Sequence, residues 1–210
     1  MLRTVVVSAL LLGCVNADVT ATFRQNGETD VRVDRFPALS VPAGQAPTPF
    51  LEPGKFEVEW TGNIQLTKRR RLYFSFEGQG EASLLIDGKE AVSEEGKFGE
   101  AKSKRLRLNP GAHQILLKYA SSEDGSGNLR LYWEEDKMPR QTIPPTVYDV
   151  EADELAVAGE LKRHGRMVFA EQNCAKCHVP EDGFGATPMP EVVEIAPVLA
   201  GLVIGFRRNG

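Results

Sequence analysis

The stretch LYFSFEGQGEASLLIDG, residues 72–88, decides the expected fold. It opens with Leu72, Phe74 and Phe76 at every second position, a period that predicts a strand with one buried face. It closes with three apolar residues followed by Asp87-Gly88. This pair predicts a tight hairpin, because both central positions of such a turn favour positive φ.

The same signals recur on both sides of this stretch. Upstream, the residues from Phe56 to Trp60 alternate cleanly. Downstream, Asn109-Pro110-Gly111 predicts a second turn, and the strand after it places four side chains on one face: His113, Ile115, Leu117 and Tyr119. Leu129, Leu131 and Trp133 close the series. Strands at this spacing predict an antiparallel β-sandwich rather than alternating α/β units.

Residues from about 20 to 148 resemble the β-sandwich domain named after a part of anthrax protective antigen. The resemblance rests on Tyr73-Phe74-Ser75-Phe76, Leu85-Ile86-Asp87-Gly88-Lys89, Asn109-Pro110-Gly111-Ala112-His113, and Asn128 to Trp133 leading to Ile143-Pro144. It implies a module that binds a carbohydrate or a cell-surface ligand. In the adhesin branch of that family, paired aspartates before the hairpin hold calcium. Residues 77–81 read EGQGE here, so the resemblance does not extend to a calcium-dependent lectin site.

The N-terminus reads as an export signal. A positively charged start at Arg3, an apolar run from Thr4 to Gly13 and small residues before position 18 predict a signal peptide over residues 1–17. The run is too short to span a membrane as a helix. We therefore expect a periplasmic or extracellular protein without a transmembrane span. Residues 11–14, LLGC, resemble a bacterial lipobox, which leaves a lipid tether at Cys14 as an alternative.

Charge excludes one class of partner. The formal net charge is -4, and both signs are scattered along the chain, so no nucleic acid partner is expected. The one dense basic run, Lys68 to Arg71, is interpreted as a solvated turn or strand edge, with an anion site as the alternative. No Ser-His-Asp set or phosphate loop is visible, so no catalytic residue is predicted.

A domain boundary is expected near Asp149. Pro139, Pro144 and Pro145 mark the exit from the sheet, since proline cannot donate to a strand ladder. Beyond the boundary, a helix is predicted from about Glu154 toward Gln172. Its apolar face is expected to contain Leu155, Ala158, Leu161, Gly165, Val168 and Phe169. The sandwich is thus assigned to residues 18–149 and a small all-α segment to residues 150–210.

The motif Cys174-Ala175-Lys176-Cys177-His178 predicts covalent attachment of haem c. Each part of the motif has a mechanical task. The thiols of Cys174 and Cys177 add to the two vinyl groups of the haem, and the adjacent His178 reaches the iron. A zinc site, a thiol–disulfide redox pair and a structural disulfide remain as alternatives for the same residues.

The flanking residues resemble class I cytochromes c. Residues 165–169, GRMVF, resemble the N-terminal helix of that family, and residues 196–202, APVLAGL, resemble its Gly-Pro-x-Leu-x-Gly loop. The resemblance implies that the carbonyl of Pro197 orients His178. It also implies that Arg207 or Arg208 neutralises a haem propionate.

The sixth iron ligand is missing from this pattern. Met189, Met167 and His164 are the candidates, and none has the position that the family uses. The haem domain is therefore expected to be incomplete at its C-terminus. The preferred function is an exported cytochrome, an electron carrier rather than an enzyme, with a redox protein as partner and the sandwich as a docking module. The alternative is a carbohydrate- or surface-binding module with a vestigial haem segment.

Overall fold

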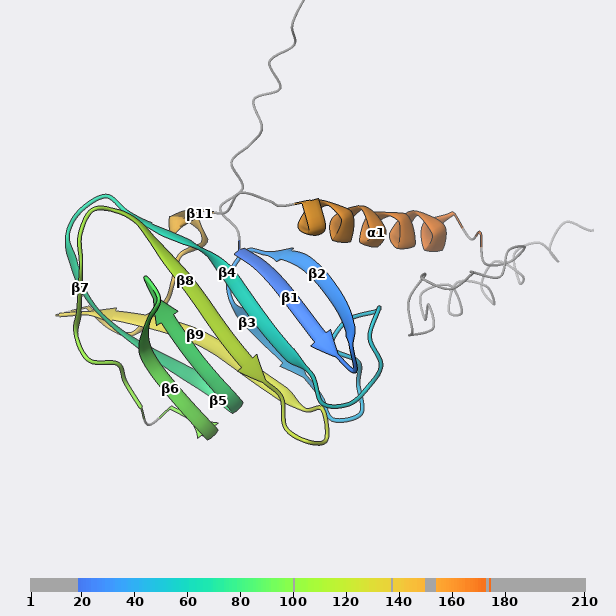
Figure 1. Ribbon diagram of the computed structural model, residues 1–210, viewed down its shortest axis with the longest axis horizontal. Coiled ribbons are helices and arrows are strands. Elements are labelled where there is room, and N and C mark those ends of the chain that lie inside the picture. Colours follow the sequence, from blue (N-terminus) through green and yellow to red (C-terminus); the bar gives the residue numbers. More distant parts are fainter. Residues whose placement is uncertain (1–18, 100, 137, 150–153, 173, 175–210) are drawn as a thin grey trace, which may run out of the picture.

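The computed structural model describes residues 19–99, 101–136, 138–149, 154–172 and 174. They form a mainly β domain and one α-helix, α1 (Glu154–Glu171), as Figure 1 shows. The mainly β fold expected from the alternating pattern is confirmed. The strands are β1 (Val19–Gln25), β2 (Glu28–Asp34), β3 (Ala38–Val41), β4 (Glu57–Leu66), β5 (Arg70–Ile86), β6 (Lys89–Phe98), β7 (Leu106–Leu108), β8 (Gly111–Ala120), β9 (Gly127–Glu135), β10 (Gln141–Thr142) and β11 (Tyr148–Asp149).

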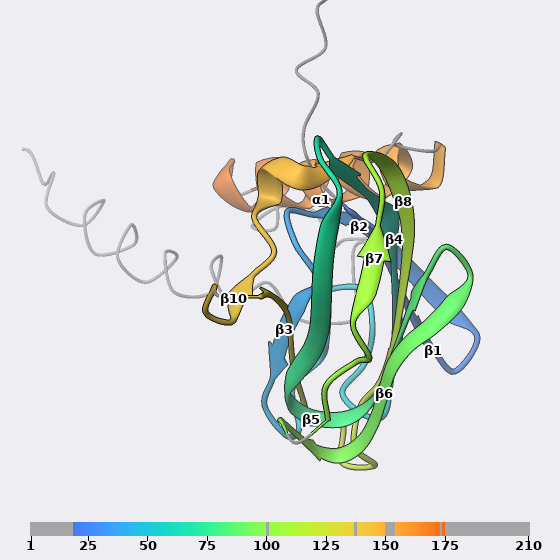
Figure 2. The same cartoon turned by 90° about the vertical axis from the view of Figure 1, so that its left-hand side faces the viewer.

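Strand β5 organises the sheet. Its first part pairs with β9 over residues 72–79, and its last part pairs with β8 over residues 81–86. All pairings are antiparallel, and the main path of the sheet is β10-β9-β5-β8-β4-β1-β2, with β3, β6, β7 and β11 attached at its sides. Because β5 belongs to both halves, the sheet curls back on itself and the halves face each other across the core (Figure 2).

The core fills the space between the two halves. Every second residue of β5 points into it, apart from the glycines at positions 78 and 80: Leu72, Phe74, Phe76, Ala82, Leu84 and Ile86 are buried. Trp60 of β4 and Trp133 of β9, the latter beside Phe74 in the sheet, are the largest fully buried side chains of the described core. Burial of each such side chain contributes roughly 1.5–3 kcal/mol, so this alternation is the main source of the stability of the fold.

Both predicted turns are present. Asp87 and Gly88 link β5 to β6 with φ angles of 51° and 73°, as a two-residue hairpin turn requires. The turn at Asn109 and Pro110 lies between β7 and β8, but it does not form a hairpin, because β7 pairs with β5. On β8, Ile115, Leu117 and Tyr119 are buried, and His113 lies at the rim of the same face.

Helix α1 occupies the predicted residues, but the predicted contact face is wrong. Leu155 and Leu161 are each 67% exposed, and Val168 is 39% exposed. The buried side chains are Ala156, Arg166 and Ala170, on the opposite side of the helix. The helix packs on strand β2, where small and charged residues fit better than large apolar ones. Among the described residues, no helix combines the length and the apolar character needed to cross a membrane.

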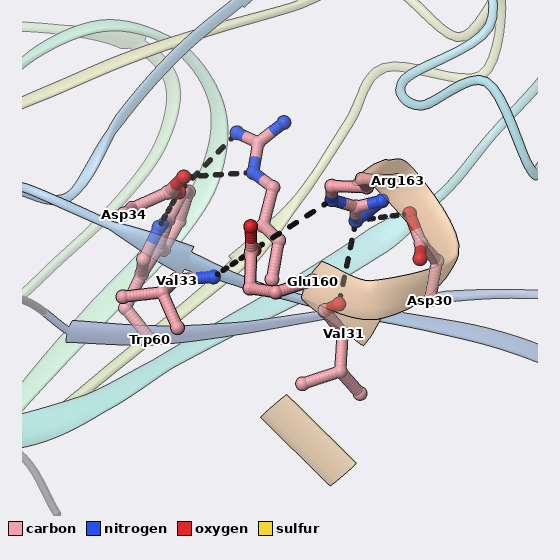
Figure 3. A network of polar contacts seen from close by, with 8 residues as sticks. Asp30, Val31, Val33, Asp34, Trp60, Glu160 and Arg163 are labelled. Atoms are coloured by element: carbon pink, nitrogen blue, oxygen red, sulfur yellow. Dashed lines mark hydrogen bonds and ion pairs between the residues drawn. The ribbon is translucent and has the colours of Figure 1, made fainter. Parts of the chain in front are cut away.

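The contact between α1 and β2 covers an open sheet edge. Strand β2 ends the main path of the sheet, so its outer backbone groups have no strand partner in the described part of the chain. The Glu160 carboxylate accepts a hydrogen bond from the N–H of Val33 at 3.0 Å. Arg163 donates to the carboxylate of Asp30 at 2.7 Å and to the carbonyl of Val31 at 3.4 Å (Figure 3). Helix α1 thus contacts the edge of the β domain directly through hydrogen bonds and an ion pair.

Candidate functional site

Most of the predicted haem residues cannot be compared with the structure. Cys177, His178, Pro197 and Arg207 lie outside the described residues, and Cys174 is partly buried after the end of α1. The signal peptide and Cys14 also lie outside the described part. Of the candidate sixth ligands, His164 and Met167 are exposed on α1, and Met189 falls in the residues that are not described. Of the predicted haem-binding residues, the described part of the structure thus contains only Cys174.

A polar groove lies where β5 bends from one half of the sheet to the other. Its volume is about 560 Å³. Five parts of the chain meet there: the bend itself, the last part of β6, the end of β8 with the loop after it, the segment before β4 and the start of β9. The residues that line it are Lys55, Gly78, Gln79, Gly80, Glu81, Glu95, Gly96, Lys97, Ala120, Ser121, Ser122, Glu123 and Asn128.

Two glycines allow the bend that forms this groove. Gly78 and Gly80 have φ angles of 131° and 129°, a region that other residues rarely adopt. A Cβ on Gly78 would lie 1.9 Å from the carbonyl oxygen of Asn128, and a Cβ on Gly80 would lie 2.5 Å from that of Ala120. Neither position can accept a side chain without moving the backbone. The EGQGE stretch is therefore the point at which β5 leaves β9 for β8.

Tyr119 links two of the segments that line the groove. Its hydroxyl donates to the carbonyl of Gln79 at 2.7 Å and accepts from the N–H of Asn128 at 3.1 Å. One side chain of β8 thus ties the bend of β5 to the start of β9. Burial raises the pKa of Tyr119 to about 12, which the hydrogen bond from Asn128 offsets only in part. The hydroxyl accordingly stays protonated and keeps this bridge at neutral pH.

The rim of the groove is charged and ordered by short-range contacts. Lys55 forms an ion pair with Glu123, and the hydrogen bond to this carboxylate raises the pKa of Lys55. In the loop after β8, the Asp124 carboxylate accepts from the backbone and hydroxyl of Ser126 at 2.9 and 2.6 Å, which lowers the pKa of Asp124. The Gln79 side chain donates to the same Ser126 hydroxyl at 3.3 Å. These contacts place hydrogen-bond donors and acceptors at and beside the edge of the groove.

Comparison with known proteins identifies the fold but not a sequence family. No family model matches the chain, and no curated protein matches it. Among solved structures, an anti-sigma factor domain-containing protein from Clostridium clariflavum is similar, with a TM-score of 0.56 and 18% identity over 65% of this chain. The match covers 48% of that protein, so this chain spans about half of its length.

Two single-domain structures are matched over nearly their whole length. A PA14 sugar-binding domain from an RTX adhesin has a TM-score of 0.51 and 12% identity, over 64% of this chain and 98% of that one. The PA14 domain of the MpAFP antifreeze protein has a TM-score of 0.52 and 7% identity, over 65% and 92% of the two chains. The β domain has a PA14-like fold. At these identities the likeness concerns the fold alone.

The predicted cytochrome c domain is corrected by these findings. The similar structures are anti-sigma factor and PA14 domains, and no family model supports a cytochrome. Within the described residues, no group of three or more His, Cys, Asp or Glu side chains could hold a metal ion. The helix expected to open the haem domain packs instead on β2 of the PA14-like domain. The recognition as a cytochrome c, and with it the description as a haem-iron electron-transfer protein, is withdrawn.

Sequence reasoning found only part of the groove. It singled out the EGQGE stretch, because that stretch aligns with the aspartate pair of the related domains. It missed Lys55, Glu95 and Asn128, which reach the groove from three other parts of the chain. No local pattern marks these residues. Their proximity depends on the bend of β5, whose only local signal is the pair of glycines.

Proposed function

We propose that the β domain, residues 19–149, is a carbohydrate- or surface-binding module with the layered form of an antiparallel β-sandwich, and that the groove at the bend of β5 is its binding site. The groove is the observation that carries the proposal. At this point the sheet leaves an opening that polar side chains from several segments line. The likeness in fold to a structure described as a PA14 sugar-binding domain supports the same reading.

The chemistry of the groove suits a sugar. Each sugar hydroxyl can donate one hydrogen bond and accept others, so a site needs both kinds of partner. The amides of Gln79 and Asn128 supply both, the carboxylates of Glu81 and Glu95 accept, and Lys97 donates. The groove is open rather than enclosed, which favours the end of a glycan or a residue on a cell surface over a buried small molecule.

Binding without calcium is part of the proposal. The stretch that corresponds to the paired aspartates of the adhesin branch reads EGQGE here, residues 77–81, and contains no aspartate. Amide and backbone groups recognise sugars by hydrogen bonds alone. In this scheme the protein is exported and attaches to a glycan-bearing surface, and no catalytic step is assigned to it.

A glycan array probed with the full chain tests the proposal. The variant Gln79→Ala/Asn128→Ala removes two exposed amides from the groove, and the expected loss of affinity is roughly tenfold, since each hydrogen bond contributes about 0.5–1.5 kcal/mol. The matched control is Gln65→Ala, an exposed amide on β4 that does not line the groove. Binding to the best glycan should persist in EDTA. The proposal fails if no glycan is bound, or if the control weakens binding as much as the groove variant does.

A further inference from the structure

A second charged surface lies along the edge strand β7. We call it the basic edge and define it as Lys68, Arg69, Arg71, Lys104, Arg105 and Arg107, all of which are exposed. The run Lys68 to Arg71 and the segment from Ala101 to Leu108 together hold eight of the 25 Lys and Arg residues of the chain and no Asp or Glu. Since the whole chain carries a net charge of -4, this clustering is local.

The fold brings the two basic segments side by side. Strand β7 pairs with the start of β5, so that Arg71 and Arg107 are direct neighbours. The contact continues beyond β7, where the backbone N–H of Ser103 donates to the carbonyl of Phe74 at 2.8 Å. Leu72 and Leu108 point into the core from the same two strands, which leaves Arg71 and Arg107 on the outer face. The basic edge is therefore one strip on the surface.

The direct pairing of Arg71 with Arg107 costs stability. Directly opposite side chains have Cβ atoms about 4.5–5.5 Å apart, and like charges in such a pair repel each other. Nearby acidic residues neutralise other cations: Glu135 pairs with Arg70 and Asp136 pairs with Arg105. Within the described residues, Arg71 and Arg107 have no such partner. An anion between these two guanidinium groups would turn the repulsion into two charge-assisted contacts.

We propose that the basic edge binds an anionic polysaccharide, a carboxylated or sulfated chain, and that it does so separately from the groove at the bend of β5. The strip is linear and follows a strand, which matches a polymer with regularly spaced charges. Guanidinium groups dominate it, and their planar donors fit carboxylate and sulfate oxygens in pairs. This surface lies beyond the proposed function of the groove, and either can fail without the other.

Other polyanions fit the basic edge less well. Nucleic acid binding to single strands uses bare aromatic rings as stacking platforms. The nearby rings of Tyr73 and Trp133 carry Lys102 at 4.2 Å and Arg70 at 5.1 Å over their faces. A membrane surface is usually held by apolar side chains inserted beside the cations. None of the exposed large apolar side chains in the described part of the chain belongs to the two basic segments.

The test measures binding of the full chain to heparin and to polygalacturonate by affinity electrophoresis, with neutral dextran as reference. Arg71→Gln/Arg107→Gln should weaken binding at about 0.1 M salt at least about tenfold, and added salt should weaken binding of the parent chain. The double variant should fold well, because it removes a repulsive pair. The matched control Arg35→Gln/Lys118→Gln removes two exposed cations elsewhere and should change binding less than about twofold.

Three results would overturn the proposal. An equal loss of polysaccharide binding in both double variants would mean that binding depends only on the net charge of the protein. Unchanged polysaccharide binding together with self-association of Arg71→Gln/Arg107→Gln would mean that the cations only protect an edge strand. Tighter binding to phosphatidylglycerol vesicles or to single-stranded DNA than to either polysaccharide would assign the edge to a different ligand. Loss of glycan-array binding in the groove variant, with polysaccharide binding intact, is the result expected for two separate surfaces.

Discussion

Gly159 of α1 lies so close to Val31 of β2 that a Cβ on the glycine would sit 1.9 Å from the carbonyl oxygen of the valine. A contact this short leaves no room for any side chain. It explains why the helix approaches the sheet edge at a glycine, and why ion pairs and small residues rather than the apolar face of the helix make the contact. The position of α1 thus depends on one missing methyl group.

Gly159→Ala should therefore detach or shift the helix. Overpacking against backbone costs about 1–3 kcal/mol, and movement of the helix would also weaken the pair between Arg163 and Asp30. Urea unfolding and hydrogen exchange of the α1 amides measure both effects. Gly165→Ala is the control, because nothing lies within 4 Å of its added Cβ. The free energy of unfolding of that variant should rise by about 0.5–1 kcal/mol, because alanine has a higher helix propensity than glycine. Equal effects of the two variants would contradict the packing described here.

Arg163→Ala should destabilise the domain by roughly 3 kcal/mol. Asp30 is only 4% exposed, and without the guanidinium its carboxylate would be buried and unpaired. Burial lowers the pKa of Arg163, although the negative charge of Asp30 acts to raise it. The double variant Asp30→Asn/Arg163→Met should recover part of the loss, since neither side chain then carries a charge. Chemical denaturation gives the free energies. A loss below about 1 kcal/mol in the single variant would show that water reaches Asp30 freely.

His113 should make stability depend on pH. Its Nδ1 contacts the Asp87 carboxylate at 2.7 Å and its Nε2 contacts the carbonyl of Asn109 at 2.9 Å. Both partners only accept, so both ring nitrogens can donate only when the imidazole is protonated. Burial acts to lower the pKa of His113, but the bonds to Asp87 and Asn109 outweigh it and the pKa lies above the ordinary 6.5.

The raised pKa of His113 sets the direction in which stability changes with pH. A raised pKa in the folded state stabilises the protein fully below about pH 6.5, and this contribution is lost as the pH rises through the folded pKa. Asp87 and Asn109 belong to two turns, which His113 clamps together, while Arg69 donates to the Asn109 side chain at 2.9 Å. The melting temperature of His113→Gln should fall less between pH 5.5 and 8.5 than that of the parent chain. His164→Gln, an exposed histidine on α1, should keep the parent profile.

Tyr119→Phe should loosen the groove. The variant leaves the Gln79 carbonyl and the Asn128 N–H without their shared partner, a cost of about 1–3 kcal/mol. The control Tyr73→Phe removes a hydroxyl with no hydrogen bond among the described residues, so its stability should change by less than about 0.5 kcal/mol. Thermal unfolding measures stability, and glycan binding reports the groove. If Tyr119→Phe loses stability but binds glycans as before, the bridge supports the fold without shaping the site.

The local pattern of apolar and turn residues was sufficient to predict much of the structure of the β domain. Alternation in β5 and β8 predicted which side chains are buried, because a strand places successive residues on opposite faces whatever its neighbours are. Asp87-Gly88 predicted its hairpin for a similarly local reason. The helix was also predicted within a residue of its observed ends. Its contact face was not, since the surface it meets is a strand edge with unpaired backbone groups and an acidic Asp30, which favour Arg163 over Leu161.

What the sequence by itself determined is the mainly β character of the chain, the buried faces of β4, β5, β8 and β9 and the extent of α1, all of which depend on spacing along a few residues. What only the tertiary structure decided is which distant residues meet. The bend at Gly78 and Gly80 joins the two halves of the sheet and creates the groove, and the pairing of β5 with β7 gathers the basic edge. Contacts between residues far apart in sequence follow from packing of the whole core, and no local pattern contains that information.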